Sequence, residues 1–165
     1  MIEPFAGTEA LIAFVAVLPV AVWVAWNDMK FMKIPNTAVL VLLALFLVLG
    51  LALLPFRSVL WGLGVGAAVL VAGFLMNMVR MIGAGDAKYA AAMAPFFVGA
   101  DLSLVLALFA ACLLGAFVSH RAAKHIPPVR AATADWLSWT VRDFPMGLAL
   151  SGTIVFYLLA AARLG

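Results

Sequence analysis

Apolar residues fall into six long runs along the chain, and short groups of charged residues, glycines and prolines separate them. Most of these runs approach the ~20 mostly apolar residues that a helix needs to cross a bilayer. The pattern therefore predicts an all-α, polytopic membrane protein with a single domain over residues 1–165. The six predicted membrane-spanning helices cover residues 9–26, 37–54, 58–79, 87–100, 102–118 and 146–164.

Residues typical of helix starts support these boundaries. Pro35 followed by Asn36 stands where the second span begins, and Pro145 stands where the last span begins. Ser58 and Asp101 have side chains that can cap the third and fifth spans. The sequence thus indicates where four of the six helices start.

The fourth run is the shortest of the six. About 14 residues correspond to a helix of ~21 Å at 1.5 Å per residue, against a hydrocarbon core of ~30 Å. A helix that starts at Asp86 is therefore predicted to begin below the membrane surface. Its carboxylate would then lie in a partly dehydrated rim.

Composition agrees with a membrane protein and excludes several kinds of site. Hydrophobic residues make up 68% of the 165 and charged residues 10%, against roughly 45–50% and about 25% in soluble domains. The single cysteine, Cys112, can form neither an intramolecular disulfide nor a four-ligand zinc site. His120 and His125 are spaced poorly for metal ligands on a helix, so we expect no metal and no cofactor.

The basic residues are distributed unevenly between the two ends of the predicted bundle. Six crossings place the connections after spans 1, 3 and 5 at one end, and only Arg57 and Arg163 fall at the other. By the positive-inside rule, the first end faces the cytoplasm and both termini lie outside. Because these charges are spread over several loops, we expect them to orient the protein in the lipid bilayer and not to bind nucleic acid. The basic residues at the predicted cytoplasmic end are Lys30, Lys33, Arg80, Lys88, Arg121, Lys124, Arg130 and Arg142.

The long polar connection covers residues 119–144. Its second half, residues 131–144, carries Trp136 and Trp139 among alternating polar residues. Tryptophans are enriched at membrane interfaces, so this pattern predicts an interfacial helix anchored by the two rings. A segment that faces the substrate is the alternative interpretation.

Four of the seven acidic residues share the predicted cytoplasmic end: Asp28, Asp86, Asp135 and Asp143. Ionisable groups close to membrane spans are costly and therefore mark candidate functional sites. Taken singly, Asp28 could be a charge balanced by neighbouring lysines, and Asp86 could be the N-cap of the fourth span. Taken together, they end the first span and open the fourth at the same face, which makes them the preferred pair.

Two carboxylates held together in a dehydrated rim cannot both ionise easily, so they share one proton over a working pH range. One carboxylate then activates a water molecule as general base, and the other donates a proton as the water attacks a carbonyl group. Gly83 and Gly85 allow a backbone to approach closely or permit a positive φ. The sequence holds no phosphate-binding loop, zinc-protease motif or serine nucleophile elbow that would favour another chemistry.

Three short motifs carry a resemblance to a known family. The run 83–88, Gly-Ala-Gly-Asp-Ala-Lys, resembles the Gly-x-Gly-Asp membrane aspartic proteases. Combined with Asp28 and with Ile-Pro-Asn at 34–36, it resembles the type IV prepilin peptidases. Phe-Pro-Met-Gly at 144–147 also resembles the Pro-x-Gly segment near the C-terminus of that family.

The resemblance implies a helical bundle like that of the Gly-x-Gly-Asp proteases, with Asp28 and Asp86 as the catalytic pair. It implies that the enzyme needs no cofactor and removes the leader of prepilin or pseudopilin precursors. The reaction would take place at the cytoplasmic face of the bacterial inner membrane, with pilus-assembly machinery as a further partner. The residues implied for the active-site and substrate loops are Gly83, Gly85, Lys88, Pro35, Asn36, Pro145 and Gly147.

The connection between the first two predicted spans, residues 27–36, is short and has no cysteine. Larger members of the family carry a cysteine-rich insert there and also N-methylate the new terminus. The chain therefore resembles the short peptidases of Flp/Tad-type pilus systems, and methylation is not expected of it.

Three other functions stay open from the sequence. An intramembrane protease similar to presenilin or signal peptide peptidase shares the Gly-x-Gly-Asp element, but its other aspartate lies within a span, whereas Asp28 ends one. A small transporter or proton relay also uses paired carboxylates. A non-catalytic scaffold of a secretion apparatus needs neither carboxylate. Cleavage of a precursor by the purified protein would separate a peptidase from the last two.

Overall fold

The computed structural model describes residues 2–164, which fold into helices joined by short connections. Five helices are long and apolar enough to cross a membrane: α1, α2, α3, α5 and α7. The elements are α1 (Gly7–Phe31), α2 (Asn36–Leu53), α3 (Phe56–Met78), α4 (Ala84–Met93), the 3₁₀ helix η1 (Ala94–Phe97), α5 (Leu102–Lys124), α6 (Pro127–Ala132), the 3₁₀ helix η2 (Leu137–Trp139) and α7 (Met146–Leu164).

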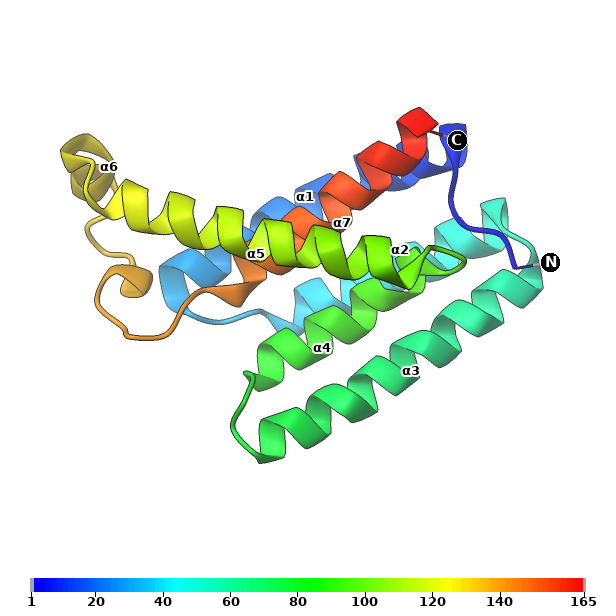
Figure 1. The fold of residues 1–165 in the computed structure, drawn as a ribbon, viewed down its shortest axis with the longest axis horizontal. Coiled ribbons are helices and arrows are strands. Elements are labelled where there is room, and N and C mark those ends of the chain that lie inside the picture. The colour runs from blue at the N-terminus through cyan, green and yellow to red at the C-terminus, as the bar shows by residue number, and fades with distance from the viewer. Residues whose placement is uncertain (1, 165) are drawn as a thin grey trace.

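The long helices lie along one direction, so their connections gather at two ends (Figure 1). The α2–α3 connection and both termini lie at one end, whereas α6 and the connections after α1 and α3 lie at the other. Helix α1 packs most extensively on α7, α3 on α4, and α5 on α7. Helix α7 therefore lies between α1 and α5 and also contacts α4.

The fourth predicted span, residues 87–100, does not form one membrane-length helix. It folds as α4, a helix of 10 residues, followed by the 4-residue η1. Helix α4 ends two residues before Pro95, because proline lacks a backbone N–H and crowds the preceding turn. Gly99 then turns the chain with a φ of 73°. The prediction of six membrane-spanning helices is thus reduced to five plus this short element.

Three of the predicted helix starts are confirmed and one is wrong. Helix α2 begins at Asn36 after Pro35, and α7 begins at Met146. The Asp101 side chain accepts hydrogen bonds from the first backbone N–H groups of α5. Ser58, however, lies inside α3, which starts at Phe56, and its buried hydroxyl accepts a hydrogen bond from the Glu3 N–H at 2.8 Å.

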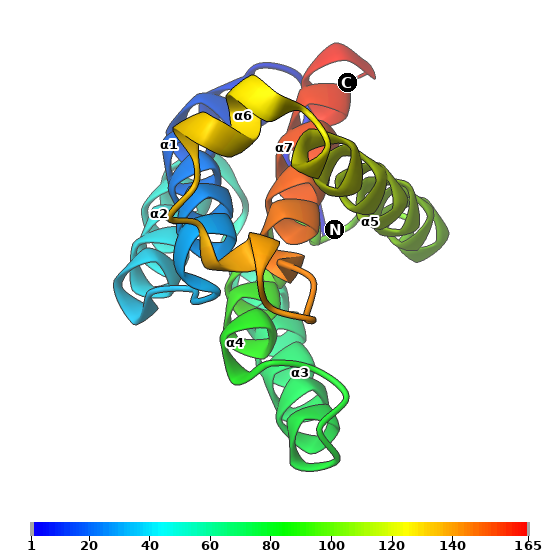
Figure 2. The ribbon, with the colours of Figure 1, turned by 90° about the vertical axis from the view of Figure 1, so that its left-hand side faces the viewer.

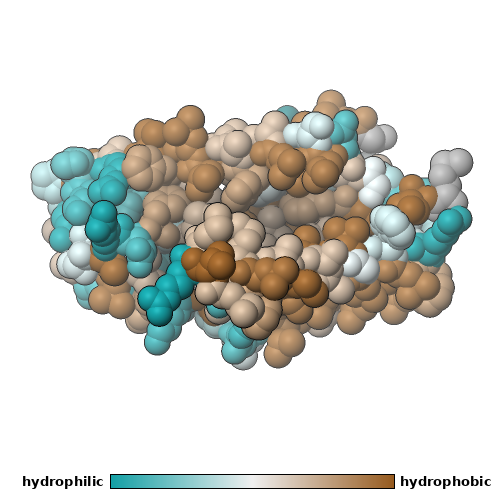
Figure 3. Space-filling model, turned by 60° about the horizontal axis from the view of Figure 1, so that its bottom comes forward, coloured by the Kyte–Doolittle hydropathy of each residue, from teal (hydrophilic) through white to brown (hydrophobic). Residues whose placement is uncertain are grey.

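Aromatic packing fills the bundle near the end that holds the N-terminus. Phe5, Phe46 and Phe96 are almost fully buried, and each ring contacts the other two with centroids 5.3–6.4 Å apart. Outside this core, many large apolar side chains are exposed along the helices, among them Leu40 and Leu114. In Figure 3 the apolar surface covers most of the molecule, and hydrophilic side chains gather mainly at the end that holds α6. This distribution is expected of a membrane protein.

The connection between α5 and α7 reaches across the bundle to α1, as Figure 2 shows. The interfacial helix predicted over residues 131–144 is wrong, because only the end of α6 and the single turn η2 are helical there. Trp139 does not anchor in an interface: it is 3% exposed and stacks on His120 with centroids 4.8 Å apart. Its indole N–H instead bonds the Thr133 carbonyl at 2.9 Å, which fixes the loop on itself.

Candidate active site

Asp28 lies in the last turns of α1 with its side chain turned into the bundle. The residue is 5% exposed, and its Oδ2 accepts a hydrogen bond of 2.7 Å from the backbone N–H of Gly147, at the start of α7. The alternative in which neighbouring lysines balance this charge is wrong for Lys30, whose ammonium pairs with Asp135 at 2.9 Å. Asp28 is therefore held by a helix that lies far along the chain.

Asp86 lies in the first turn of α4, but it is not the N-cap. Gly83 occupies the cap position, and its backbone N–H donates to the Asp86 carboxylate. Burial and the charge of Asp28 together raise the pKa of Asp86 to about 6, although the Gly83 hydrogen bond opposes both. The two carboxylates are thus close enough to interact electrostatically.

Both aspartates line one cavity of about 570 Å³ at the end of the bundle that holds α6. The Ile-Pro-Asn segment at the start of α2 and the Gly-x-Gly-Asp segment at the start of α4 form its other walls. Of the residues predicted from the sequence, the cavity brings together Asp28, Asp86, Gly83, Gly85, Pro35, Asn36 and Lys88. Gly147 joins them through its hydrogen bond to Asp28, whereas Pro145 is buried just before α7 and lines neither this cavity nor the next.

A second cavity, of about 490 Å³, is also lined by both aspartates. It is lined by residues outside the predicted site, notably Asn77 near the end of α3, Arg80 after α3 and Asp143 before α7. Arg80 has a φ of 59°, and the Asn77 amide donates to the Ile82 carbonyl at 2.8 Å, so this turn is folded on itself. From the sequence, Asp143 is recognised only as one of the acidic residues at the predicted cytoplasmic end of the bundle. Asp135 shares that property.

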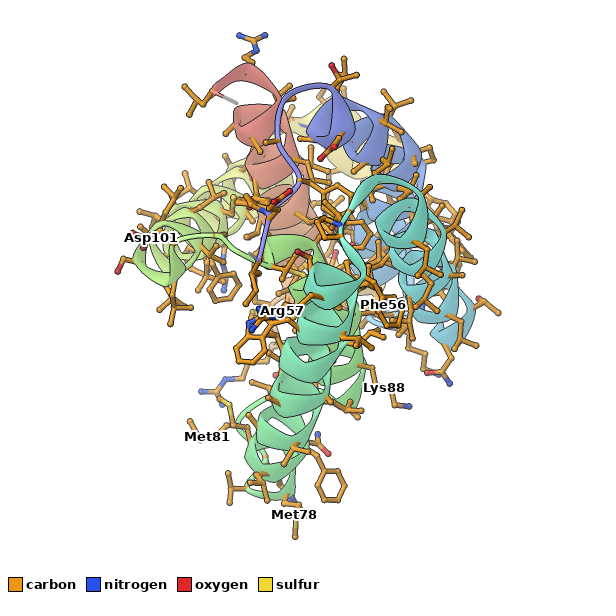
Figure 4. The ribbon with its side chains drawn as sticks, turned by 90° about the vertical axis from the view of Figure 1, so that its right-hand side faces the viewer. Phe56, Arg57, Met78, Met81, Lys88 and Asp101 are labelled. Carbon is orange, nitrogen blue, oxygen red and sulfur yellow. The ribbon has the colours of Figure 1, made fainter. Side chains whose placement is uncertain are left out.

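The start of α2 and the start of α4 are joined by one hydrogen bond and pack closely. The Lys88 ammonium donates to the Asn36 side-chain oxygen at 3.3 Å, and Figure 4 shows Lys88 projecting from α4. A Cβ added to Gly85 would lie 3.5 Å from the Cβ of Ile34, which is ordinary packing distance. The Ile-Pro-Asn segment is therefore a wall of the cavity.

The glycines near the aspartates differ in what they make room for. A Cβ on Gly83 would lie 2.6 Å from Oδ2 of Asp86, and a Cβ on Gly147 would lie 2.9 Å from Oδ2 of Asp28. Neither Gly83 nor Gly85 has a positive φ. Close approach of a carboxylate, and not an unusual backbone conformation, is thus the reason for glycine at 83 and 147.

Asp135 is a poor candidate for a third member of the site. Its carboxylate is largely exposed, and the hydrogen bond from Lys30 lowers its pKa. Within residues 2–164, no three histidine, cysteine or acidic side chains lie close enough to hold a metal ion. The chemistry suggested by the described residues is that of two interacting carboxylates beside an open cavity, which is suited to activating water by proton transfer.

One family of known proteins matches this chain. The model of the type IV leader peptidase family matches residues 12–120, a range that includes both Asp28 and Asp86 and ends before Gly147. No curated protein and no solved structure matches the chain. The family match covers well over half of the sequence and includes both segments that form the cavity around the two aspartates. This chain therefore belongs to the type IV leader peptidase family.

Proposed function

We propose that this membrane peptidase is an aspartic endopeptidase in which Asp28 and Asp86 together activate water. The observation that carries the proposal is their shared position. Asp28 and Asp86 come from different helices, line the same two cavities, and interact strongly enough for the charge of Asp28 to raise the pKa of Asp86. A pair that titrates as one unit supplies both a proton acceptor and a proton donor.

The environments of the two carboxylates suggest a division of roles. The raised pKa of Asp86 keeps its proton up to about pH 6, so we assign Asp86 as the general acid. Because Oδ2 of Asp28 already accepts a hydrogen bond from the Gly147 N–H, we assign the other carboxylate oxygen of Asp28 as the base. Asp28 takes a proton from water, the water oxygen bonds to the scissile carbonyl carbon, and Asp86 protonates the carbonyl oxygen. Collapse of this adduct breaks the C–N bond and re-forms the C=O bond. The proton held by Asp28 passes to the leaving amine, and a hydroxyl proton of the adduct returns to Asp86.

The leader of a prepilin-like precursor is the proposed substrate, and the cytoplasmic face of a bacterial inner membrane is the proposed location. The family match supports the first point. The second is supported by the basic residues at the end of the bundle where the cavity opens, among them Lys33, Lys88 and Arg130. We propose cleavage without N-methylation, because the connection between α1 and α2 holds only four residues and no cysteine.

A cleavage assay with the purified protein in liposomes and a prepilin-like precursor tests the proposal. Asp28→Asn and Asp86→Asn should each lower the rate by about 10²–10⁴-fold, because each removes one partner of the proton transfer. Asp135→Asn, at the same end but paired with Lys30, and Asp101→Asn, at the opposite end, are matched controls that should keep the wild-type rate. Wild-type cleavage by either of the first two variants would overturn the proposal.

A further inference from the structure

We propose that Tyr89 is a positioning residue, which acts through a hydrogen bond to Ser151 of α7 to hold Asp86 opposite Asp28. The inference rests on the proposed function, since it explains how the two carboxylates are kept at a fixed separation. Neither Tyr89 nor Ser151 lines the cavities around the pair. Tyr89 would therefore act through the position of α4 and not by contact with the substrate.

The contact itself is buried. Tyr89 is 0% exposed and Ser151 4%, and their hydroxyl oxygens lie 3.1 Å apart. Within residues 2–164 this is the only hydrogen bond between two side chains in which both partners are buried. A hydroxyl enclosed in apolar surroundings loses a partner that water cannot replace, so such a bond favours one arrangement of the helices over others.

Helix α7 connects this bond to the other aspartate. In residues 2–164, two hydrogen bonds join buried residues that are far apart in sequence: Tyr89 with Ser151, and Gly147 with Asp28. Both end on α7, and their positions on that helix, 147 and 151, are about one turn apart. One rigid stretch of α7 is thus bonded to the helix of each aspartate.

A similar spacing, close to one helical turn, is found on α4. Asp86 and Tyr89 are three residues apart, so they lie near the same side of the helix. A displacement of α4 along or away from α7 would break the Tyr89 bond and move Asp86 relative to Asp28. The chain of contacts from Asp28 to Gly147, Ser151, Tyr89 and Asp86 therefore defines the distance between the two carboxylates.

The experiment compares Tyr89→Phe and Ser151→Ala with Tyr157→Phe. Tyr157 is the other tyrosine of the chain; it is buried on α7 against Phe97, and its hydroxyl makes no hydrogen bond in the described residues. Two readouts are needed: kcat and KM for precursor cleavage, and the pKa of Asp86 by ¹³C NMR of aspartate-labelled protein without substrate. The second readout does not depend on turnover.

We expect both Tyr89→Phe and Ser151→Ala to lower kcat by about ten- to a hundredfold with little change in KM, the cost of a small misplacement of a reacting group. The pKa of Asp86 should fall, because the Asp28 charge becomes more distant. The double variant should be no worse than the more impaired single variant, since both remove one bond. Tyr157→Phe should match the wild type in both readouts.

Unchanged kcat and unchanged Asp86 pKa in Tyr89→Phe and Ser151→Ala would overturn the positioning role. So would a loss of kcat that accompanies a wild-type Asp86 pKa, because that result describes general destabilisation. Failure of the proposed function is recognised separately: the wild-type protein would then not cleave the precursor, or Asp28→Asn and Asp86→Asn would cleave it normally. The Asp86 pKa would still report whether Tyr89 and Ser151 set the separation.

Discussion

Asp86 gains and loses its proton close to neutral pH, because partial burial and the charge of Asp28 raise its pKa from 3.8 to about 6. Below that pH the general acid of the proposed mechanism is present; above it, both carboxylates become ionised and the acid is lost. We predict that kcat/KM falls as the pH rises above about 6. A pH–rate profile on liposomes measures this decline.

The direct check is to remove the neighbouring charge. In Asp28→Asn the pKa of Asp86 should fall toward 3.8, although burial still holds it above that value. ¹³C NMR of the carboxyl carbon measures the change without any need for cleavage. An Asp86 pKa that is the same in the variant and in the wild type would mean that the two groups do not interact.

The two glycines of the Gly-x-Gly-Asp segment should respond differently to alanine. A Cβ at position 83 meets the Asp86 carboxylate at 2.6 Å, whereas a Cβ at position 85 meets Ile34 at 3.5 Å. We predict that Gly83→Ala lowers kcat by about tenfold or more, since the carboxylate must move. Gly85→Ala should retain most of the activity. Equal effects in a cleavage assay would contradict the assigned role of Gly83.

Helix α4 is held against α3 by a very close approach of the two backbones. A Cβ at Gly73 of α3 would lie 2.8 Å from the Cβ of Ala87, directly after Asp86. We predict that Gly73→Leu displaces α4, lowers the thermal midpoint in detergent by several degrees, as expected for a loss of about 1–3 kcal/mol, and abolishes most of the cleavage.

Gly64 on the same helix is the matched control, because a Cβ there meets nothing within 4 Å. Gly64→Leu should therefore leave both the thermal midpoint and the cleavage rate close to those of the wild type. If the two leucine variants melt at the same temperature, the α3–α4 contact does not determine the position of α4.

Hydropathy predicted the long helices well because each long run must become a helix to satisfy its backbone in lipid. It overestimated the length of the helix formed by the fourth run, since apolar composition alone does not reveal that Pro95 and Gly99 divide the segment. It also failed over residues 131–144, where the two tryptophans pack on neighbouring side chains. In that loop, side-chain packing determines the conformation, and the sequence has no periodic hydrophobic pattern that would predict it.

The residues around the cavity likewise divide into those that the sequence predicted and those that it did not. Short-range motifs predicted Asp86, Gly83, Lys88 and Asn36, which lie in two local segments. The hydrogen bond from Gly147 to Asp28 spans 119 positions, and that between Tyr89 and Ser151 spans 62. Such pairs depend on which helices become neighbours and in which register, information that the hydrophobic pattern of a single chain does not contain.

For the molecule as a whole, the two ends of the bundle differ in character. The cavities around Asp28 and Asp86 open at the end that holds α6, where hydrophilic side chains gather (Figures 1 and 3). At the other end, the segment before α1 enters the bundle, and Phe5 packs against both Phe46 and Phe96 with an exposure of 1%. Rings packed this tightly leave no polar partner for water.

We expect the packed rings of Phe5, Phe46 and Phe96 to be a barrier to protons at the end of the bundle opposite the cavities. In the proposed mechanism, Asp28 and Asp86 exchange protons with water at the end that holds α6, so we expect each proton that enters to return to the side from which it came. We predict that liposomes containing the protein keep an imposed pH difference as long as empty liposomes do, as measured by an internal pH-sensitive dye. Phe5→Ala should make them leak if the rings are the barrier. Acid–base chemistry at one end of a membrane-spanning bundle would then leave a pH difference across the membrane intact.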